Sequence, residues 1–446
     1  MNKIRILLML VPAWIFAQQT TPTNYTFGLQ QAISYAMEHN YTTINASRDI
    51  AISKQKKWET TAMGLPQVNA GIDYQNNIVL QRSLIPAEIF GGPPGTFAEV
   101  AFGTNQSAAV RGSLSQLIFD GSYIVALQAS KAYLQFFENA KKKTDSEIRE
   151  MVTNSYGNVL LADESIKILE KNIVVIAKNK NDAEQIFKNG LGEQETVEQL
   201  SITESSLKIS LERINRVREI SLNMLKVQLG LKVSDDLKLT DNLEILSVAT
   251  SLPILNNNSF DASTNIDYQI ANSLVTQKRL LLKLEKAKAL PSLAATANVG
   301  ANAFSQTFMF LNTGQRWFNF SNVGVSLNVP IFSSFARRAR TQQAKLDFEK
   351  AQTQLTEAEQ MLQLQFQRAK SDLEFSLAEY ATTKNSLQLA ERIERKQQIK
   401  FKEGLSTSFE FAEAQRQLYA EQQNHLQSMV NIINKKAAFE KINSGK

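Results

Sequence analysis

The sequence predicts a mainly α-helical fold with a membrane β-barrel share, built from one helix–strand–strand–helix–helix unit that occurs twice. Three observations predict it: unevenly placed glycine and proline, sequence blocks that recur in order, and segments in which apolar and polar residues alternate. The chain has 446 residues, of which 43% are hydrophobic and 21% charged, and no cysteine. This composition excludes disulfide scaffolds and cysteine nucleophiles. The mean hydropathy of −0.24 excludes a bundle of membrane-spanning helices.

The N-terminus has the pattern of a secretory signal peptide. Lys3 and Arg5 precede an apolar run from Ile6 to Phe16, and the small residue Ala17 follows. We therefore expect residues 1–17 to be removed on export. Eleven apolar residues are too few for a membrane-spanning helix, and without a cysteine no N-terminal lipid anchor is expected. The protein is expected in the bacterial envelope or outside the cell.

Three blocks recur in the same order, 225, 213 and 214 residues apart. They pair Met63–Val68 with Lys288–Leu293, Ser113–Phe119 with Ser326–Phe332, and Phe187–Leu191 with Phe401–Leu405. Their shared order indicates a duplication, with a first repeat at 18–245 and a second at 246–446. The offset changes within 75–105, where we expect a longer loop, with Pro86–Gly95 at the surface. Val233–Asp261 is expected to be a linker with short local structure.

Two strands are expected in each repeat, at about 66–82 and 104–118 and at about 291–311 and 316–330. Apolar and polar residues alternate in each, which predicts one apolar and one polar face. A soluble core explains such alternation equally well, but aromatic residues near the turn at 312–314 favour a membrane. These interface candidates are Phe308, Phe310, Trp317 and Phe318. Four strands cannot close a barrel, since about eight are needed, so several chains must contribute.

Long helices are expected where glycine and proline are missing. Ile331–Glu403, a run of 73 residues, contains neither. Within it, apolar residues from Ala351 to Tyr380 recur about every 3.6 residues, near the period of a straight helix. This stripe fits a wide helical barrel, although an antiparallel coiled coil would show it too.

At this point the residues resemble a known family, the TolC-like outer-membrane efflux proteins (outer membrane factors). The resemblance rests on the duplicated unit, Leu-Pro at the entry of two strands, Ile118-Phe119-Asp120-Gly121, and two Phe-x-x-Gly-Leu turns. It implies a homotrimer with a 12-stranded barrel in outer-membrane lipid, four strands from each chain, continued by an α-helical periplasmic barrel. It also implies a passive duct that docks to a periplasmic adaptor (membrane fusion protein) and an inner-membrane pump. The chain departs from the pattern at Ser333-Ser334, where Asp-Gly is expected, and at Leu117, where proline is expected.

The two Phe-x-x-Gly-Leu turns correspond to the family's periplasmic tips. Gly190 and Gly404 fit a chain reversal between antiparallel helices, for which a plain C-cap glycine is sufficient explanation. The resemblance adds an adaptor-docking surface at Gly190, Leu191, Gly404 and Leu405.

Glu410 and Glu413 lie three residues apart, on one face of the helix after the second turn. The resemblance places them where acidic residues narrow the pore, so that a trimer would carry six carboxylates that favour cations. The alternative is structural, because Thr407 and Glu410 also form a capping box. Where the family often has a charged latch, this chain has Thr196 and Ser406.

We expect export of small toxic compounds from a tripartite efflux pump, in a pore without catalytic residues, cofactor or metal. A duct for type I protein secretion remains an alternative, as does an exported coiled-coil scaffold without a pore. No triad, phosphate-binding loop or metal-ligand spacing suggests an enzyme, and no clustered basic patch suggests a nucleic-acid partner. The sequence does not identify the substrate, the pump or the adaptor.

Overall fold

The computed structural model describes residues 23–250 and 260–443, and the expected signal peptide at 1–17 lies outside them. Among the described helices, none is both long enough and apolar enough to cross a membrane.

The chain forms two compact units, each assembled from separate stretches of sequence. The first contains the described residues of Met1–Ile44, Asp145–Ser259 and Phe366–Asn443. The second contains Asn45–Thr144 and Phe260–Gln365.

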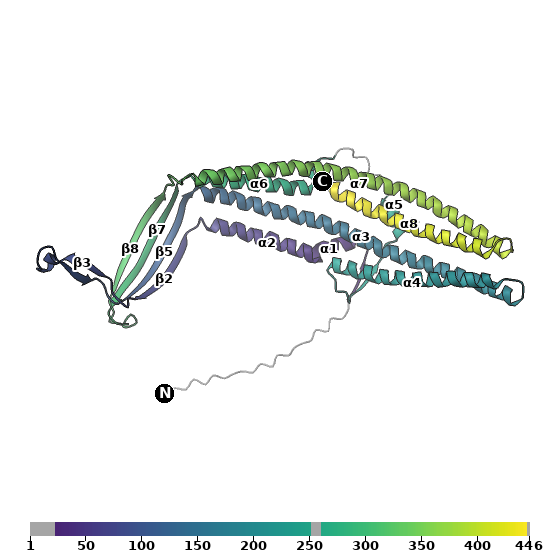
Figure 1. The fold of residues 1–446 in the computed structure, drawn as a ribbon, viewed down its shortest axis with the longest axis horizontal. Helices are drawn as coiled ribbons and strands as arrows, with labels where there is room; N and C mark the ends of the chain where they lie inside the picture. The colour runs from purple at the N-terminus through teal and green to yellow at the C-terminus, as the bar shows by residue number, and fades with distance from the viewer. Residues whose placement is uncertain (1–22, 251–259, 444–446) are drawn as a thin grey trace, which may run out of the picture. The chain divides into compact units, whose positions relative to one another are not determined.

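Both halves of the sequence show the same order of a helix, two long strands and two long helices (Figure 1). The first half has α2 (Tyr41–Ala62), β2 (Gln67–Asn76), β5 (Gln106–Asp120), α3 (Gly121–Lys188) and α4 (Gln194–Leu229). The second half has α6 (Ile266–Ala287), β7 (Ser292–Ser305), β8 (Trp317–Asn328), α7 (Ala336–Lys402) and α8 (Ser408–Asn443). Equivalent helices are nearly equal in length, with 22 and 22, 68 and 67, and 36 and 36 residues. The predicted duplicated unit is confirmed.

The sequence explains where these helices begin and pack. Helix α7 occupies the glycine- and proline-free run, and every member of the predicted stripe from Ala351 to Tyr380 is buried or half-buried. Helices α2 and α6 begin after Asn40 and Asn265, which the repeat aligns. Each asparagine Oδ1 accepts the backbone N–H two residues on, at 2.7 and 2.8 Å. Such caps satisfy N–H groups that have no partner inside the helix.

The main sheet is antiparallel, with the order β2-β5-β7-β8. Among the described strands, β2 and β8 each have a neighbour on one side only, so the sheet has two open edges. Two strands end about six residues earlier than expected, β2 at Asn76 and β7 at Ser305. The pairing of β7 with β8 runs without a shift from Ser292↔Asn328 to Ala303↔Trp317.

The longer loop of the first repeat contains a β-hairpin that the sequence reasoning missed. Strands β3 (Arg82–Pro86) and β4 (Phe97–Ala101) pair antiparallel across the short helix η1 (Ala87–Phe90). The expected surface loop at Pro86–Gly95 is therefore the turn of this hairpin. Strands of five residues are too short to show a clear alternation.

The expected linker at Val233–Asp261 is also more ordered than predicted. It contains β6 (Asp236–Leu239), which pairs parallel with β1 (Asn24–Phe27), and α5 (Leu243–Thr250). The apolar residues Leu237 and Leu243 are buried in the core of the first unit, which holds the segment in place.

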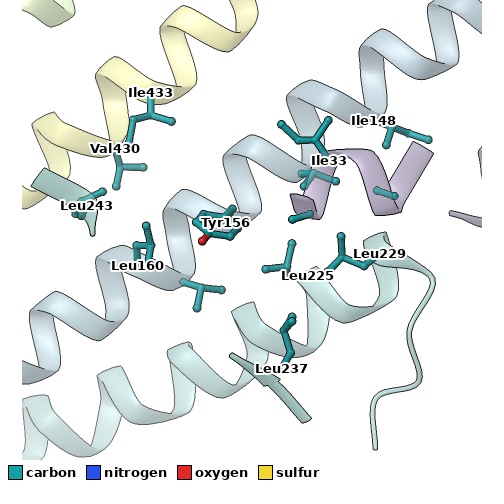
Figure 2. Close-up of a cluster of buried hydrophobic side chains, with 14 of the residues drawn as sticks. Ile33, Ile148, Tyr156, Leu160, Leu225, Leu229, Leu237, Leu243, Val430 and Ile433 are labelled. Carbon is teal, nitrogen blue, oxygen red and sulfur yellow. The ribbon is translucent and has the colours of Figure 1, made fainter. Parts of the chain in front are cut away.

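Tyr156 of α3 lies in the middle of that core. The core also contains residues of α1 (Leu29–His39), α4 and α8 (Figure 2). The ring of Tyr156 is fully buried, and its hydroxyl lies 3.0 Å from Asp241 Oδ2 and 3.1 Å from the Phe27 carbonyl oxygen. Burial raises the pKa of the Tyr156 hydroxyl. A single side chain thus links α3 to the end of β1 and to the segment after β6.

Candidate functional site

The turns at Gly190 and Gly404 have the same conformation. Their φ angles are +74° and +71°, in the left-handed region that glycine adopts without a Cβ penalty. In each turn the glycine N–H donates to the carbonyl three residues before it, at 2.9 and 3.1 Å. The next leucine N–H donates to the carbonyl five residues before it, at 3.1 and 2.8 Å. Both are Schellman caps, so the structural role of the two glycines is satisfied without a partner protein.

The leucines that follow these glycines have no comparable role in packing. Leu191 is 83% exposed and Leu405 is 76% exposed. Both turns lie at the same end of their helices (Figure 1). A small core behind them contains Leu200 of α4 and Phe411 of α8, and Phe401 of α7 stacks on Phe411 with ring centroids 5.1 Å apart. The two leucines are thus exposed apolar side chains next to a small, well-packed core.

Glu410 forms the capping box of α8. Its Oε2 accepts the backbone N–H of Thr407 at 3.1 Å, and Thr407 Oγ1 accepts the backbone N–H of Glu410 at 3.2 Å. The Ser406 hydroxyl also donates to Glu410 Oε2, at 2.8 Å. These hydrogen bonds, that from Ser406 above all, lower the pKa of the Glu410 carboxyl. Glu410 is therefore ionised and held at the helix N-terminus.

Glu413 has different surroundings. It forms an ion pair with Arg416 on the same helix and lines a cavity of about 670 Å³ between α3, α4, α7 and α8. Glu410 is not among the lining residues. The other charged groups that line the cavity are Lys171, Glu391, Glu394, Arg395 and Arg416. Burial raises the pKa of the Glu394 carboxyl. The sequence reasoning missed these groups, because nothing in their spacing separates them from ordinary surface charges of long helices.

The register of the main sheet separates two faces. The apolar face carries Val68, Ile72, Val110, Leu114, Val299, Val323 and Val325, with Asn319 and Ser321 as exceptions. These apolar side chains are exposed, Val323 by 84%. On the polar face Arg111 pairs with Asp73, with 3.4 Å between nitrogen and oxygen, and Asn298 Nδ2 donates to Asn322 Oδ1 at 2.9 Å.

The four aromatic candidates do not lie together. Tyr74 and Trp317 share the apolar face, with Ala108 and Ala303 between them in one row. Phe310 packs on this row, and the ring centroid of Phe308 lies 5.6 Å from that of Tyr74. Phe308, Phe310 and Trp317 therefore lie close to this row of residues. Phe318 follows Trp317 in β8 and therefore lies on the opposite, polar face.

Part of the chain matches a known protein family. Residues 269–442 match the sequence model of the family described as outer membrane efflux protein. No curated protein sequence matches the chain. Residues 269–442 thus carry an outer membrane efflux protein domain, and the resemblance inferred from the sequence is confirmed.

Solved structures extend the likeness in fold to almost the whole chain. CusC, whose structures concern transmembrane channel formation, is 16% identical, with a TM-score of 0.75 over 100% of this chain and 99% of its own. The outer membrane protein VceC of Vibrio cholerae is 16% identical, with a TM-score of 0.71 over 93% and 95%. The CmeC outer membrane channel of Campylobacter jejuni is 17% identical, with a TM-score of 0.69 over 94% and 85%. The fold of this chain is that of outer-membrane channel proteins.

Proposed function

We propose that the protein is a passive, trimeric outer-membrane channel that exports small toxic compounds from a tripartite efflux pump. The observation that carries the proposal is the sheet β2-β5-β7-β8, which exposes an apolar face and has a polar face behind it. An exposed apolar sheet of this length is unfavourable in water and favourable in lipid. The strands have 10 to 15 residues, enough to span a membrane when tilted.

The open edges of the sheet support the oligomer. The unpaired N–H and C=O groups at the edges of β2 and β8 would have no hydrogen-bond partner in hydrocarbon. Burying one such group without a partner costs about 2–7 kcal/mol. Pairing β2 of one copy with β8 of the next removes both edges, and three copies give twelve strands. The polar face then lines the pore and the apolar face contacts lipid.

The helices supply the periplasmic part of the duct in this proposal. A helix of 68 residues, such as α3, has a length of roughly 100 Å at about 1.5 Å per residue. We infer that Leu191 and Leu405, exposed beyond their glycine caps, contact the periplasmic adaptor of the inner-membrane pump. We also infer that Glu413, together with Glu410, gives the narrow end of the pore its negative charge.

The experiment uses the natural absence of cysteine from the chain. Asn298→Cys and Val299→Cys place a thiol on the polar and the apolar face of the same strand. In planar bilayers, a charged, water-soluble thiol reagent is expected to change the conductance of the Asn298→Cys channel only. No conductance from the unmodified protein, or an equal response of both variants, would contradict the proposal. A deletion strain with unchanged susceptibility to toxic compounds would favour protein secretion instead.

A further inference from the structure

Three phenylalanines lie on the face of the sheet that should be polar. Phe318 pairs with Asn302 and Phe320 pairs with Gly300, so both share a face with Asn298 and Asn322. Phe304, two residues after Asn302, lies on that face too. Because β7 and β8 pair without a shift, no bulge rotates these side chains to the apolar side.

The alternation in β8 is inverted from Phe318 to Ser321. Asn319 and Ser321 lie on the apolar face, and Phe318 and Phe320 on the polar face. From Asn322 onward the polar residues return to the polar face. The inversion is thus confined to the end of the sheet next to the β7–β8 turn.

Phe304 and Phe318 form a cluster with a cation, and Phe320 lies beside Gly300 on the same face. The ring centroids of Phe304 and Phe318 are 6.1 Å apart, and Arg316 Cζ lies 5.0 Å from the centroid of Phe318. Phe320 lies over Gly300, where an added Cβ would be 2.7 Å from Phe320 Cζ. Glycine at this position thus leaves room for the ring on the polar face.

The cluster retains free surface and a positive charge. Phe304 is 50% exposed and Phe318 is 47% exposed, so both rings can contact a ligand. In the part of the chain that the structure describes, Arg316 forms no ion pair, whereas Arg111 on the same face is neutralised by Asp73. Aromatic rings beside a guanidinium group favour a ligand with a flat apolar body and a negative charge.

We propose that Phe304, Phe318 and Phe320 form, with Arg316, a pore-side binding site for aromatic anions such as aryl sulfonates and carboxylates. The proposal rests on the channel proposed above, in which the polar face lines the pore. Three copies of the site surround the pore at the end of the barrel that carries the β7–β8 turns. An anion bound there reduces the ion current.

The test measures block of the reconstituted full chain in planar bilayers by naphthalenesulfonate, with methanesulfonate as the non-aromatic anion. Wild-type channels are expected to be blocked at a lower concentration of naphthalenesulfonate than of methanesulfonate. Phe304→Leu with Phe318→Leu keeps apolar volume and removes two ring faces. It is expected to raise the half-blocking concentration of naphthalenesulfonate at least about fivefold. Arg316→Gln, which leaves all three rings in place, is expected to act in the same direction.

Phe308→Leu is the matched control, because Phe308 contacts Tyr74 of the apolar face. It is expected to leave the half-blocking concentration unchanged. Equal block by both anions, unchanged block in both the leucine and the Arg316→Gln channels, or an equal effect of Phe308→Leu would overturn the site while the channel stands. A wild-type protein without conductance would overturn the proposed function and the site with it.

Discussion

The Ser406 hydroxyl donates a hydrogen bond to Glu410 Oε2 at 2.8 Å, which fixes the carboxylate at the first turn of α8. Glu413, three residues later, makes no part of this cap and lines the cavity between the four long helices. The two acids that the sequence presents as a pair therefore have different surroundings. One is held by the backbone and the other is paired with Arg416.

The first prediction concerns the charge of the pore. Glu410→Ala combined with Glu413→Ala removes six carboxylates from a trimer, and cation selectivity in planar bilayers is expected to fall. The half-blocking concentration of multivalent cations is expected to rise roughly tenfold, which corresponds to about 1.4 kcal/mol. If conductance, selectivity and block equal those of the wild type, Glu410 and Glu413 do not line the pore.

The second prediction separates the cap from the charge. Thr407→Ala removes the hydroxyl that accepts the Glu410 N–H and is expected to lower the free energy of unfolding by about 1 kcal/mol. Both carboxylates remain, so selectivity should stay at the wild-type value. Thermal unfolding in detergent measures the loss. A Thr407→Ala protein that unfolds at the wild-type temperature would show that the capping box contributes nothing.

The third prediction tests the exposed tip. Leu405→Glu places a charge where an apolar contact with the adaptor is proposed. Burying a leucine is worth about 1.5–3 kcal/mol, so its replacement should weaken docking at least about tenfold. Pump-dependent resistance of cells is expected to fall, while conductance in bilayers stays the same. Leu311→Glu, an equally exposed leucine at the β7–β8 turn, should leave resistance intact. Full resistance in the Leu405→Glu strain would exclude this leucine from docking.

The fourth prediction concerns the corner between β8 and α7. Ser334 and Phe335 have φ angles of 47° and 62°, in the left-handed region. Ser334 occupies the position that Gly121 has in the first repeat. Arg337 holds this corner, since its guanidinium donates to the carbonyl oxygens of Pro330 and Ile331 at 2.8 and 3.1 Å. Ser334→Gly removes the strain of a Cβ and is expected to stabilise the protein by up to about 1 kcal/mol.

Ser333→Gly is the matched control at the same corner. The Ser333 hydroxyl accepts a hydrogen bond from Arg337 Nε at 3.2 Å, so this variant should unfold at a lower temperature than wild type. Stabilisation by both glycines, or by neither, would mean that the left-handed conformation of Ser334 carries no strain.

The sequence was informative where a local pattern decides the structure. The run without glycine and proline predicted α7 to within a few residues of its observed ends. The alternation of apolar and polar residues predicted which side chains of β2 and β7 share a face. The sequence pattern grouped Phe318 with Phe308, Phe310 and Trp317 as interface aromatics, whereas the strand register places it on the opposite face. The face of a residue near a strand end depends on the register with the neighbouring strand, which the sequence alone does not show. The pairing of β1 with β6 joins residues 212 positions apart over four residues, too few for a signal. The cavity beside Glu413 depends on how four helices pack against one another, and the sequence of a single helix does not predict that packing.

The last prediction concerns pH and His425 of α8. Its ring is buried and stacks on Tyr380 with centroids 5.2 Å apart, and Nδ1 lies 3.3 Å from Thr383 Oγ1. Burial, and then the positive charge of Lys384, lower the pKa of the His425 imidazole. The folded protein thus keeps the ring neutral at a pH where the unfolded chain, with a pKa of about 6.5, already binds a proton.

The free energy of unfolding is therefore expected to decrease as the pH falls below about 6.5, and this contribution levels off below the pKa of the folded state. His425→Gln has no proton to take up and should remove this part of the pH dependence. Thermal unfolding in detergent between about pH 7.5 and about pH 5.5 compares the two proteins. Parallel profiles for wild type and His425→Gln would show that the buried imidazole has the same proton affinity in both states.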